Sequence, residues 1–482
     1  MWPWLIIPIV LGALLVIFIA VILIRAFMFK PLNVENKTSH PVFVNGEKAV
    51  HDLGEMIKCK TISHRDASLD DEAEFLKFEK LLPELFPTVY AKCSFEKVGN
   101  RGLLLKWKGK SSDAPSVFMS HYDVVSVEEK DWEKPAFEGI IDNGVLWGRG
   151  TIDTKNTLNG VLQAAETLIG EGFVPSNDIY FAFGGNEEVN GDGSYGIVQL
   201  FKERGISPGL VLDEGGAVCT GVFPGVKDSI ALIGIGEKGM VNVEYTVKGG
   251  GGHSSSPTAG GPVARLSKTC LNVEKAGFKY TLTKPTKEMF NTVGRYSTFL
   301  YRVIFANQWC FGPVLALYSK STGGEMNAIV RTTTAFTQME GSQGVNVIPP
   351  VAKMASNHRI IPGETVESVV EHIKKAVNDE NVEVTVINGN NPSVISETHC
   401  EAYDRVKSAV AETWQDAIVS PYLMVAGSDS RHWGEISDKV YRFSAMALTK
   451  EERGYIHGNN ERLPFATISK TVEFFLRILK KC

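Results

Sequence analysis

The sequence lacks paired cysteines, basic stretches, internal repeats and low-complexity tracts. No two cysteines form a C-x-x-C pair, which disfavours a thiolate zinc site and a disulfide framework. A net charge of −5 over 482 residues leaves no basic footprint for nucleic acid, so no nucleic-acid partner is expected. The 44% hydrophobic and 22% charged shares allow two or three globular domains. The seven scattered cysteines are Cys59, Cys93, Cys219, Cys270, Cys310, Cys400 and Cys482.

One long apolar run is present, at the N-terminus. Residues 5–24 carry no charge, and a helix of that length can cross the hydrocarbon core of a bilayer, which is about 30 Å thick. No small-x-small cleavage site precedes Arg25, which favours an uncleaved anchor over a removed signal peptide. Arg25 and Lys30 follow the run, which by the positive-inside rule favours a cytosolic body. The sequon Asn36-Lys37-Thr38 instead favours a lumenal, glycosylated stalk, so the residues alone leave the orientation open.

Short apolar runs alternate with helical patterns after residue 46. Residues 116–119, 179–183 and 210–212 each predict a buried strand. Residues 157–169 place their apolar side chains on one face and predict the helix between the first two strands, ended by Gly170. This alternation predicts an α/β domain with a mostly parallel sheet.

A second pattern begins near Lys238 and predicts a smaller α+β domain inserted into the first. Residues 241–247, 332–338 and 352–361 alternate like half-exposed strands, and residues 365–377 predict a helix. The stretch 278–320 is rich in aromatic residues and lacks strand alternation. The predicted division is an anchor with linker (1–45, span 5–24), a catalytic domain in two parts (46–237 and 396–482) and an inserted lid (238–395).

Residues of metal-ligand type follow the predicted strands. His121 and Asp123 end the first strand, Glu187 and Glu188 the second, and Asp213 the third. The carboxyl ends of parallel strands share one edge of the sheet, where ligands bind in α/β folds. Singly, each has an ordinary explanation: an exposed turn, a solvated acidic pair or a helix N-cap. Together they indicate a site.

Two further segments supply candidate ligands. Asp153 lies just before the predicted helix, and Gly148 and Gly150 allow a tight turn that brings its carboxylate inward. His457 lies in a late loop, where a purely structural role is the alternative. Imidazole and carboxylate without thiolate suit a catalytic zinc pair, with cobalt or manganese as alternatives.

Six motifs occur in the order of a known family. The sequence resembles the dizinc aminoacylase and carboxypeptidase family, and within it the subgroup of vacuolar carboxypeptidase S and N-fatty-acyl-amino acid synthase/hydrolase. The resemblance covers roughly residues 50–480. The motifs are His-x-Asp, Gly-Arg-Gly-x-x-Asp-x-Lys, the Glu-Glu pair, Asp-Glu-Gly-Gly, Gly-Gly-x-His-Ser-Ser and His-Gly-x-Asn-Glu.

The resemblance implies a role for each motif residue. His121 and Asp213 would bind one zinc ion, Glu188 and His457 the other, and Asp153 would bridge them. Asp123 would orient His121, and Glu187 would be the general base. His253 would reach the reacting carbonyl from the lid, and Arg359 would bind the substrate carboxylate. The family often has a second acid where this chain has Thr154, next to a cis peptide bond.

The resulting hypothesis is a zinc-dependent amidohydrolase that cleaves N-acyl, and in particular N-fatty-acyl, amino acids, with the reverse condensation left open. The aromatic stretch 278–320 would line an acyl pocket, or else form the core of the insertion or a subunit interface. Alternatives are a carboxypeptidase or dipeptidase and a non-catalytic membrane-anchored binding module. A third alternative, a serine hydrolase, is disfavoured because the sequence lacks a G-x-S-x-G elbow.

The expected partners are a small molecule with a free carboxylate, the membrane through the N-terminal helix and, as an open alternative, a second copy of the chain. The anchor and the resemblance to exported relatives favour a single-pass protein of the secretory pathway with a lumenal or extracellular body. A cleaved, secreted form remains an alternative.

Overall fold

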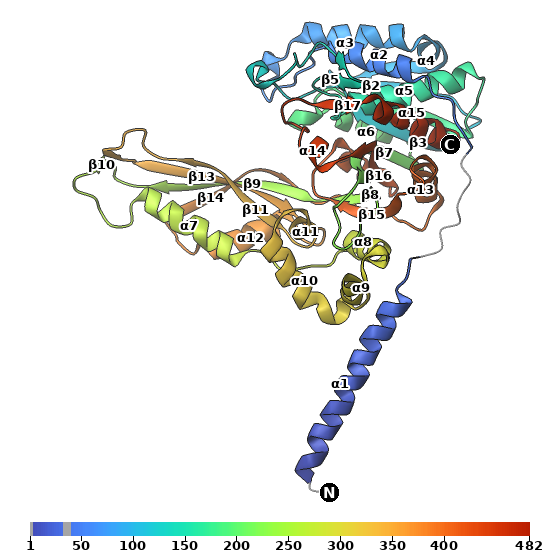
Figure 1. Ribbon diagram of the computed structural model, residues 1–482. Helices are drawn as coiled ribbons and strands as arrows, with labels where there is room; N and C mark the ends of the chain where they lie inside the picture. Colours follow the sequence, from blue (N-terminus) through green and yellow to red (C-terminus); the bar gives the residue numbers. More distant parts are fainter. Residues whose placement is uncertain (1–2, 32–39) are drawn as a thin grey trace.

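The computed structural model describes residues 3–31 and 40–482, which form a body, a lid and a projecting N-terminal helix (Figure 1). The strands of the body's large sheet are β1 (Ser94–Val98), β2 (Gly102–Trp107), β3 (Ser111–His121), β6 (Asn177–Gly184), β7 (Leu210–Cys219), β8 (Ile230–Glu237), β15 (Ile418–Met424) and β16 (Val440–Leu448). They follow the order β1-β2-β6-β3-β7-β16-β8-β15. The pairs β3–β6, β3–β7, β7–β16 and β8–β15 are parallel, which confirms the predicted α/β fold.

Helices cover both faces of this sheet. Phe118 and Phe181 pack toward α5 and α15, whereas Val117 and Tyr180 pack toward α6. Because both faces are buried, the central strands are apolar throughout, and the three predicted strands lie within β3, β6 and β7. The helices are α2 (Gly46–Ile57), α3 (Glu72–Leu85), α4 (Pro87–Lys92), α5 (Lys155–Gly170), α6 (Gly193–Glu203), α13 (Glu401–Thr413), α14 (Lys450–Arg453) and α15 (Phe465–Leu479).

A three-stranded sheet joins two distant loops of the body. It consists of β4 (Ile140–Asp142), β5 (Val145–Trp147) and β17 (Arg462–Pro464). In the antiparallel pair β5–β17, Trp147 lies opposite Arg462. The segment that leads from β5 to Asp153 therefore lies beside the segment that carries His457 and Glu461.

The lid is the arm that extends from the body in Figure 1. Its main sheet has the order β11-β13-β9-β14 and is covered by two helices, with the apolar side of β9 in a separate core. A two-stranded ribbon stands at the tip. The elements are β9 (Gly239–Lys248), β11 (Thr333–Glu340), β13 (Val351–Ile360), β14 (Val382–Asn390), α7 (Pro262–Ala276), α12 (Val366–Val377) and the ribbon strands β10 (Gly252–His253) and β12 (Val347–Ile348). The predicted strands and helix of this region are present.

The aromatic stretch forms helices, in keeping with its lack of strand alternation. They are α8 (Lys284–Val293), α9 (Phe299–Ala306), α10 (Gln308–Thr322) and α11 (Gly324–Ala328). Phe290 and Phe305 from this segment share a core with Ile230 of β8 and Ile418 of β15. The segment thus packs against the body. We expected it beside the part of the lid that bears His253, but that residue lies at the far tip (Figure 1).

The N-terminal helix α1 (Pro3–Met28) projects from the body on the side of α9 and α10 (Figure 1). Residues 7–28 are long and apolar enough to cross a membrane, as the sequence predicts for residues 5–24. Most of its side chains are exposed because only its C-terminal part contacts the rest of the chain. Asn36, the predicted glycosylation site, lies outside the described residues.

Candidate metal centre

The carboxyl ends of β3, β6 and β7 bring together most of the predicted site residues. His121 is the last residue of β3 and lies opposite Gly184, the last residue of β6. Beyond β6, Glu187 and Glu188 begin a 3-10 turn (Glu187–Val189). Gly185 leaves no room for a side chain, because an added Cβ would lie 2.4 Å from the ring of Tyr122. This glycine therefore lets the chain turn sharply toward His121.

His121 is buried among acidic groups. Its Nε2 atom lies 3.1 Å from Asp153 Oδ1 and 3.4 Å from Glu214 Oε1. Its Nδ1 atom lies 3.0 Å from the Asp123 carbonyl and 3.4 Å from the Asp123 carboxylate. Nδ1 is thus held by the backbone and side chain of Asp123, and Nε2 points into the carboxylate group.

His457 approaches the same carboxylate from the opposite side. Its Nε2 atom lies 3.1 Å from Asp153 Oδ2 and 3.0 Å from Glu188 Oε2. The two Asp153 oxygens therefore face different imidazoles, His121 on Oδ1 and His457 on Oδ2. A carboxylate shared in this way has the arrangement expected of a bridge between two metal ions.

Burial makes this concentration of acids unfavourable without a cation. Burial, with Asp153 nearby, raises the pKa of Glu214 to about 8, despite the opposing effect of His121. Burial also raises the pKa of Glu187 well above its usual value, assisted by Asp429 and Glu214. Divalent ions would offset this repulsion, and an imidazole–carboxylate donor set fits zinc. Two sets of donor atoms lie within 4.8 Å of one another: His121–Glu187–Glu214 and His121–Asp153–Glu188.

Asp123 fixes the acidic loop as well as His121. Fully buried, its carboxylate accepts hydrogen bonds from Glu187 N and Glu188 N, both at 3.1 Å, and from Ser63 Oγ at 2.6 Å. One side chain thus sets the position of an imidazole and of two further carboxylates. That agrees with the orienting role implied by the family resemblance.

Glu461 is a positioning residue to which sequence reasoning gave no role. Its buried carboxylate accepts hydrogen bonds from Gly150 N, Ile152 N and Asp153 N. It also pairs with Arg149 Nη1 at 2.7 Å, and Arg149 Nη2 donates to the Gly458 carbonyl. These contacts join the Asp153 loop to the His457 loop. The sequence signal that could have indicated this role was the final Glu of the motif His-Gly-x-Asn-Glu.

Glu214 and Asp213 are adjacent acids at the carboxyl end of β7. Glu214 Oε1 lies 3.4 Å from His121 Nε2. The buried Asp213 carboxylate accepts a hydrogen bond from Ser430 N at 3.0 Å. Burial raises the pKa of Asp213, and the charge of His121 is among the effects that oppose this rise. Asp213 therefore stays a predicted ligand beside His121, and Glu214, to which sequence reasoning gave no role, is a second candidate.

Two predicted residues lie away from the cluster. His253 is exposed at the lid tip, where its Nδ1 atom lies 2.9 Å from Ser255 Oγ. Among the described residues its ring hydrogen-bonds Ser255 and no member of the cluster. Arg359 lies on β13 at the base of the lid and has no carboxylate partner among the described ion pairs, although its guanidinium hydrogen-bonds Asn357 Oδ1. Burial lowers the pKa of Arg359, and Glu237 opposes this effect.

The structure explains two features of the sequence, the Asp153–Thr154 bond and the segment 205–209. The Asp153–Thr154 peptide bond is cis, as the resemblance implied, and the buried Thr154 hydroxyl donates to Thr157 Oγ1 at 2.8 Å. Residues 205–209 match the letters G-x-S-x-G, but they precede β7 and so lie at its amino end. A nucleophile elbow would follow a strand, so this segment does not form one.

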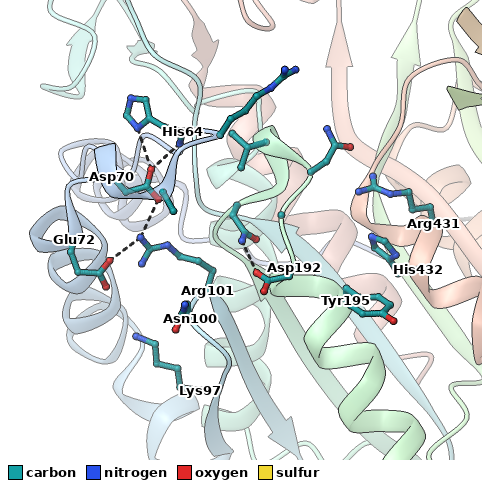
Figure 2. A pocket seen from close by; sticks show the side chains of 16 residues that line it. His64, Asp70, Glu72, Lys97, Asn100, Arg101, Asp192, Tyr195, Arg431 and His432 are labelled. Atoms are coloured by element: carbon teal, nitrogen blue, oxygen red, sulfur yellow. Dashed lines mark hydrogen bonds and ion pairs between the residues drawn. The ribbon is translucent and has the colours of Figure 1, made fainter. Parts of the chain in front are cut away.

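Two cavities flank the cluster, and they differ in polarity. Figure 2 shows the polar one, which begins at Asn186 and whose side chains largely pair with each other, such as Arg101 with Asp70 and Glu72. The lining of the other cavity includes Gly215 and Ile456, which directly adjoin Glu214 and His457 in the sequence. Its walls are mainly apolar and include Val222, Phe223, Leu232, Met289, Val293 and Ile329. Only this second cavity suits an alkyl group.

Residues 117–481 match the model of the peptidase family M20/M25/M40. The chain belongs to this family. It is 34% identical to the probable carboxypeptidase S-like 2 of Dictyostelium discoideum, over 87% of this chain and 82% of that protein. It is 32% identical to the N-fatty-acyl-amino acid synthase/hydrolase PM20D1 of Xenopus tropicalis, over 97% and 93%.

Two solved structures share the fold, and one of them is described as an M20 family metallo-carboxypeptidase. The metallo-carboxypeptidase Sso-CP2 from Sulfolobus solfataricus aligns with a TM-score of 0.68 at 18% identity, covering 90% of this chain and 98% of that one. Human carnosine dipeptidase 1 aligns with a TM-score of 0.64 at 16% identity, covering 90% and 96%. The chain is thus a metal-dependent hydrolase of amide bonds, as predicted, and a non-catalytic binding module is disfavoured.

Proposed function

We propose that the protein hydrolyses the amide bond of N-fatty-acyl amino acids, using two zinc ions. The observation that carries this proposal is the apolar cavity, whose lining includes Gly215 and Ile456, the sequence neighbours of Glu214 and His457. Burial of an alkyl chain stabilises binding by about 0.8 kcal/mol per methylene, so such a cavity favours long acyl groups over acetyl. The activity for which the Xenopus relative is named agrees with this substrate class.

The donor atoms divide naturally between two ions. We assign His121, Asp153 and Glu214 to one zinc ion, and Asp153, Glu188 and His457 to the other. The ion-pair distances of 3.0–3.4 Å between these groups support the division. Each ion then has three protein ligands and an open position, as catalytic zinc requires. Cobalt or manganese would fit the same donors.

Bound zinc would lower the pKa of a water molecule and polarise the amide carbonyl. Glu187 takes the proton of the attacking water and delivers it to the nitrogen as the C–N bond breaks, which yields a fatty acid and an amino acid. Its partly buried position beside Glu188 and Glu214 suits that task. The reverse condensation would use the same groups.

Arg359 and His253 complete the proposed site from the lid. The guanidinium of Arg359, which forms no ion pair among the described residues, matches the carboxylate of the amino-acid part. His253 would stabilise the oxyanion, which from its tip position requires closure of the lid or a second copy of the chain. A homodimer therefore stays a prediction, as do the lid boundaries at residues 238 and 395.

The membrane arrangement is also part of the proposal. We infer that α1 is an uncleaved anchor and that the body faces the secretory lumen or the exterior, with Asn36 glycosylated. Protease digestion of sealed vesicles should leave residues 40–482 protected. Degradation of the body from the cytosolic side would overturn this orientation. Endoglycosidase treatment should change the electrophoretic mobility of the wild type and leave that of an Asn36→Gln variant unchanged.

The decisive experiment compares kcat/KM for N-oleoyl-phenylalanine, N-acetyl-phenylalanine and a glycyl-leucine dipeptide on one preparation. The oleoyl substrate should be preferred. Val222→Trp, which narrows the apolar cavity from a loop, should lower kcat/KM for the oleoyl substrate and leave the acetyl substrate unchanged. Preference for the dipeptide would favour a dipeptidase or carboxypeptidase and refute the lipid substrate.

A further inference from the structure

Helices α9 and α10 expose large apolar side chains on one side of the body. We call Phe299, Leu300, Trp309, Val314 and Leu317 the apolar platform. Leu300 is 72% exposed and Leu317 71%, values that are costly for leucine in water. Residues 303–319 carry no Asp, Glu, Lys or Arg. A contiguous apolar surface of this kind marks contact with a membrane or with another protein.

The platform is continuous with the proposed anchor. Phe18 packs edge-on against Trp309 with ring centroids 5.8 Å apart, and Phe27 packs against Phe299 at 4.9 Å. Polar contacts fix the junction between α9 and α10: Arg25 donates to the Ala306 carbonyl at 3.0 Å, and Asn307 Nδ2 donates to the Ile22 carbonyl at 3.1 Å. The junction therefore has a fixed position along α1.

That position gives the depth of the platform. Arg25 ends the uncharged part of α1, and Phe18 lies seven residues earlier. At 1.5 Å per residue, Trp309 lies about 10 Å along the helix from the charged end. Interfacial helices bury their apolar faces about 5–10 Å into the headgroup and acyl boundary, and tryptophan is enriched at that level. If α1 spans a bilayer, the platform therefore lies at the boundary between the headgroups and the acyl chains.

We propose that α9 and α10 lie in the outer leaflet beside α1, with the platform covered by lipid acyl chains, and that the enzyme takes its acylated substrate from this leaflet. The helices connect to the apolar cavity through one core: Phe305 of α9 packs with Met289 and Val293 of α8, which line the cavity. The substrate part of this proposal rests on the proposed fatty-acyl substrate, whereas the membrane position rests on the proposed anchor α1 and not on that substrate.

Photocrosslinking tests the position directly. The full chain, in phosphatidylcholine vesicles, would carry p-benzoyl-phenylalanine at position 300, 317 or 271. Leu271 on α7 is the matched control, because it is a helical leucine of similar exposure, 65%, in the lid. Lipid adducts should form at 300 and 317 and not at 271. Absence of lipid adducts at 300 and 317, or crosslinks there to a second copy of the chain, would overturn the proposal.

A kinetic experiment tests substrate delivery. The double variant Leu300→Glu/Leu317→Glu should lose about tenfold or more in kcat/KM for vesicle-borne N-oleoyl-phenylalanine, because buried charge is costly in the bilayer. Its activity on soluble N-acetyl-phenylalanine should be unchanged, and Leu271→Glu should change neither. Equal loss on both substrates, or no loss on either, would overturn delivery from the membrane. Lipid adducts at positions 300 and 317, together with no activity of the wild-type enzyme on N-oleoyl-phenylalanine, would refute the proposed function and support the membrane position.

Discussion

The body and the lid each bury a histidine on a strand, and the pKa values of the two imidazoles are shifted in opposite directions. His121 ends β3 and faces acids: burial lowers its pKa, but Glu214 and hydrogen bonds to Asp123 and Asp153 raise it well above the usual value. His358 on β13 is fully buried beside hydroxyl groups, with Thr334 Oγ1 at 3.0 Å and Ser356 Oγ at 2.7 Å. Burial, assisted by His372, lowers its pKa to about 4.

The difference shows what makes a buried imidazole a metal ligand. Hydroxyl groups satisfy the ring nitrogens of His358 without adding charge, so the neutral ring is stable by itself and serves the lid core. The carboxylates around His121 repel one another and stay charged only beside cations. The acidic site in the body thus needs bound metal ions for its stability, whereas the neutral His358 in the lid core does not. Each prediction below tests this contrast.

The largest effect is expected from chelation. Removal of metal should abolish hydrolysis, and it should lower the thermal unfolding midpoint because bound metal contributes about 4 kcal/mol at a thousandfold excess over Kd. Hydrogen exchange should rise in residues 185–190 and 454–461 and stay unchanged in β9 and β13. Added zinc should restore activity and protection. Equal loss of protection in the lid strands would contradict the contrast between the two regions.

Glu187→Gln should separate proton transfer from metal binding. The amide cannot accept the proton, so kcat should fall by about 10²- to 10⁴-fold. Metal content, measured by inductively coupled plasma mass spectrometry, should match the wild type, since Asp123 still holds the loop through backbone groups. A variant that keeps its activity would remove Glu187 from the role of base.

Glu214→Gln and Asp213→Asn are a matched pair of substitutions on adjacent residues. Loss of the Glu214 carboxylate should release about one metal ion per chain on dialysis, because its oxygen faces His121. Asp213→Asn keeps an oxygen for Ser430 N and should lower metal affinity less, by about 10- to 100-fold at most. A larger loss of metal binding in Asp213→Asn than in Glu214→Gln would support the sequence-based assignment of Asp213 as the ligand.

The smallest effect is expected in the lid. His358 has a folded pKa of about 4 and an unfolded pKa of about 6.5, so the unfolded chain binds more protons between these values. Stability should therefore fall by about 2 kcal/mol from pH 7 to pH 5 through this group. His358→Gln should remove that loss in urea unfolding, while metal-dependent losses remain common to both proteins. Equal pH dependence in the two proteins would show that folding leaves the pKa of His358 unchanged.

The sequence by itself determined the class of fold, the apolar helix and most of the site. Strand and helix periods reflect local geometry, so β3, β6, β7 and α5 could be read from apolar runs. The ordered motifs named the ligand types, and His121, Asp153, Glu188 and His457 do meet in space. Such signals are visible because each depends on a few neighbouring residues.

Only the tertiary structure decided the remaining features. That Glu214 lies close to His121 depends on the course of β7, which the run of buried residues on both sides conceals. The role of Glu461 depends on a strand pairing between residues more than 300 positions apart. The aromatic stretch could have belonged to the lid or the body, and its packing against β8, β15 and α1 was set by long-range contacts that no local pattern encodes.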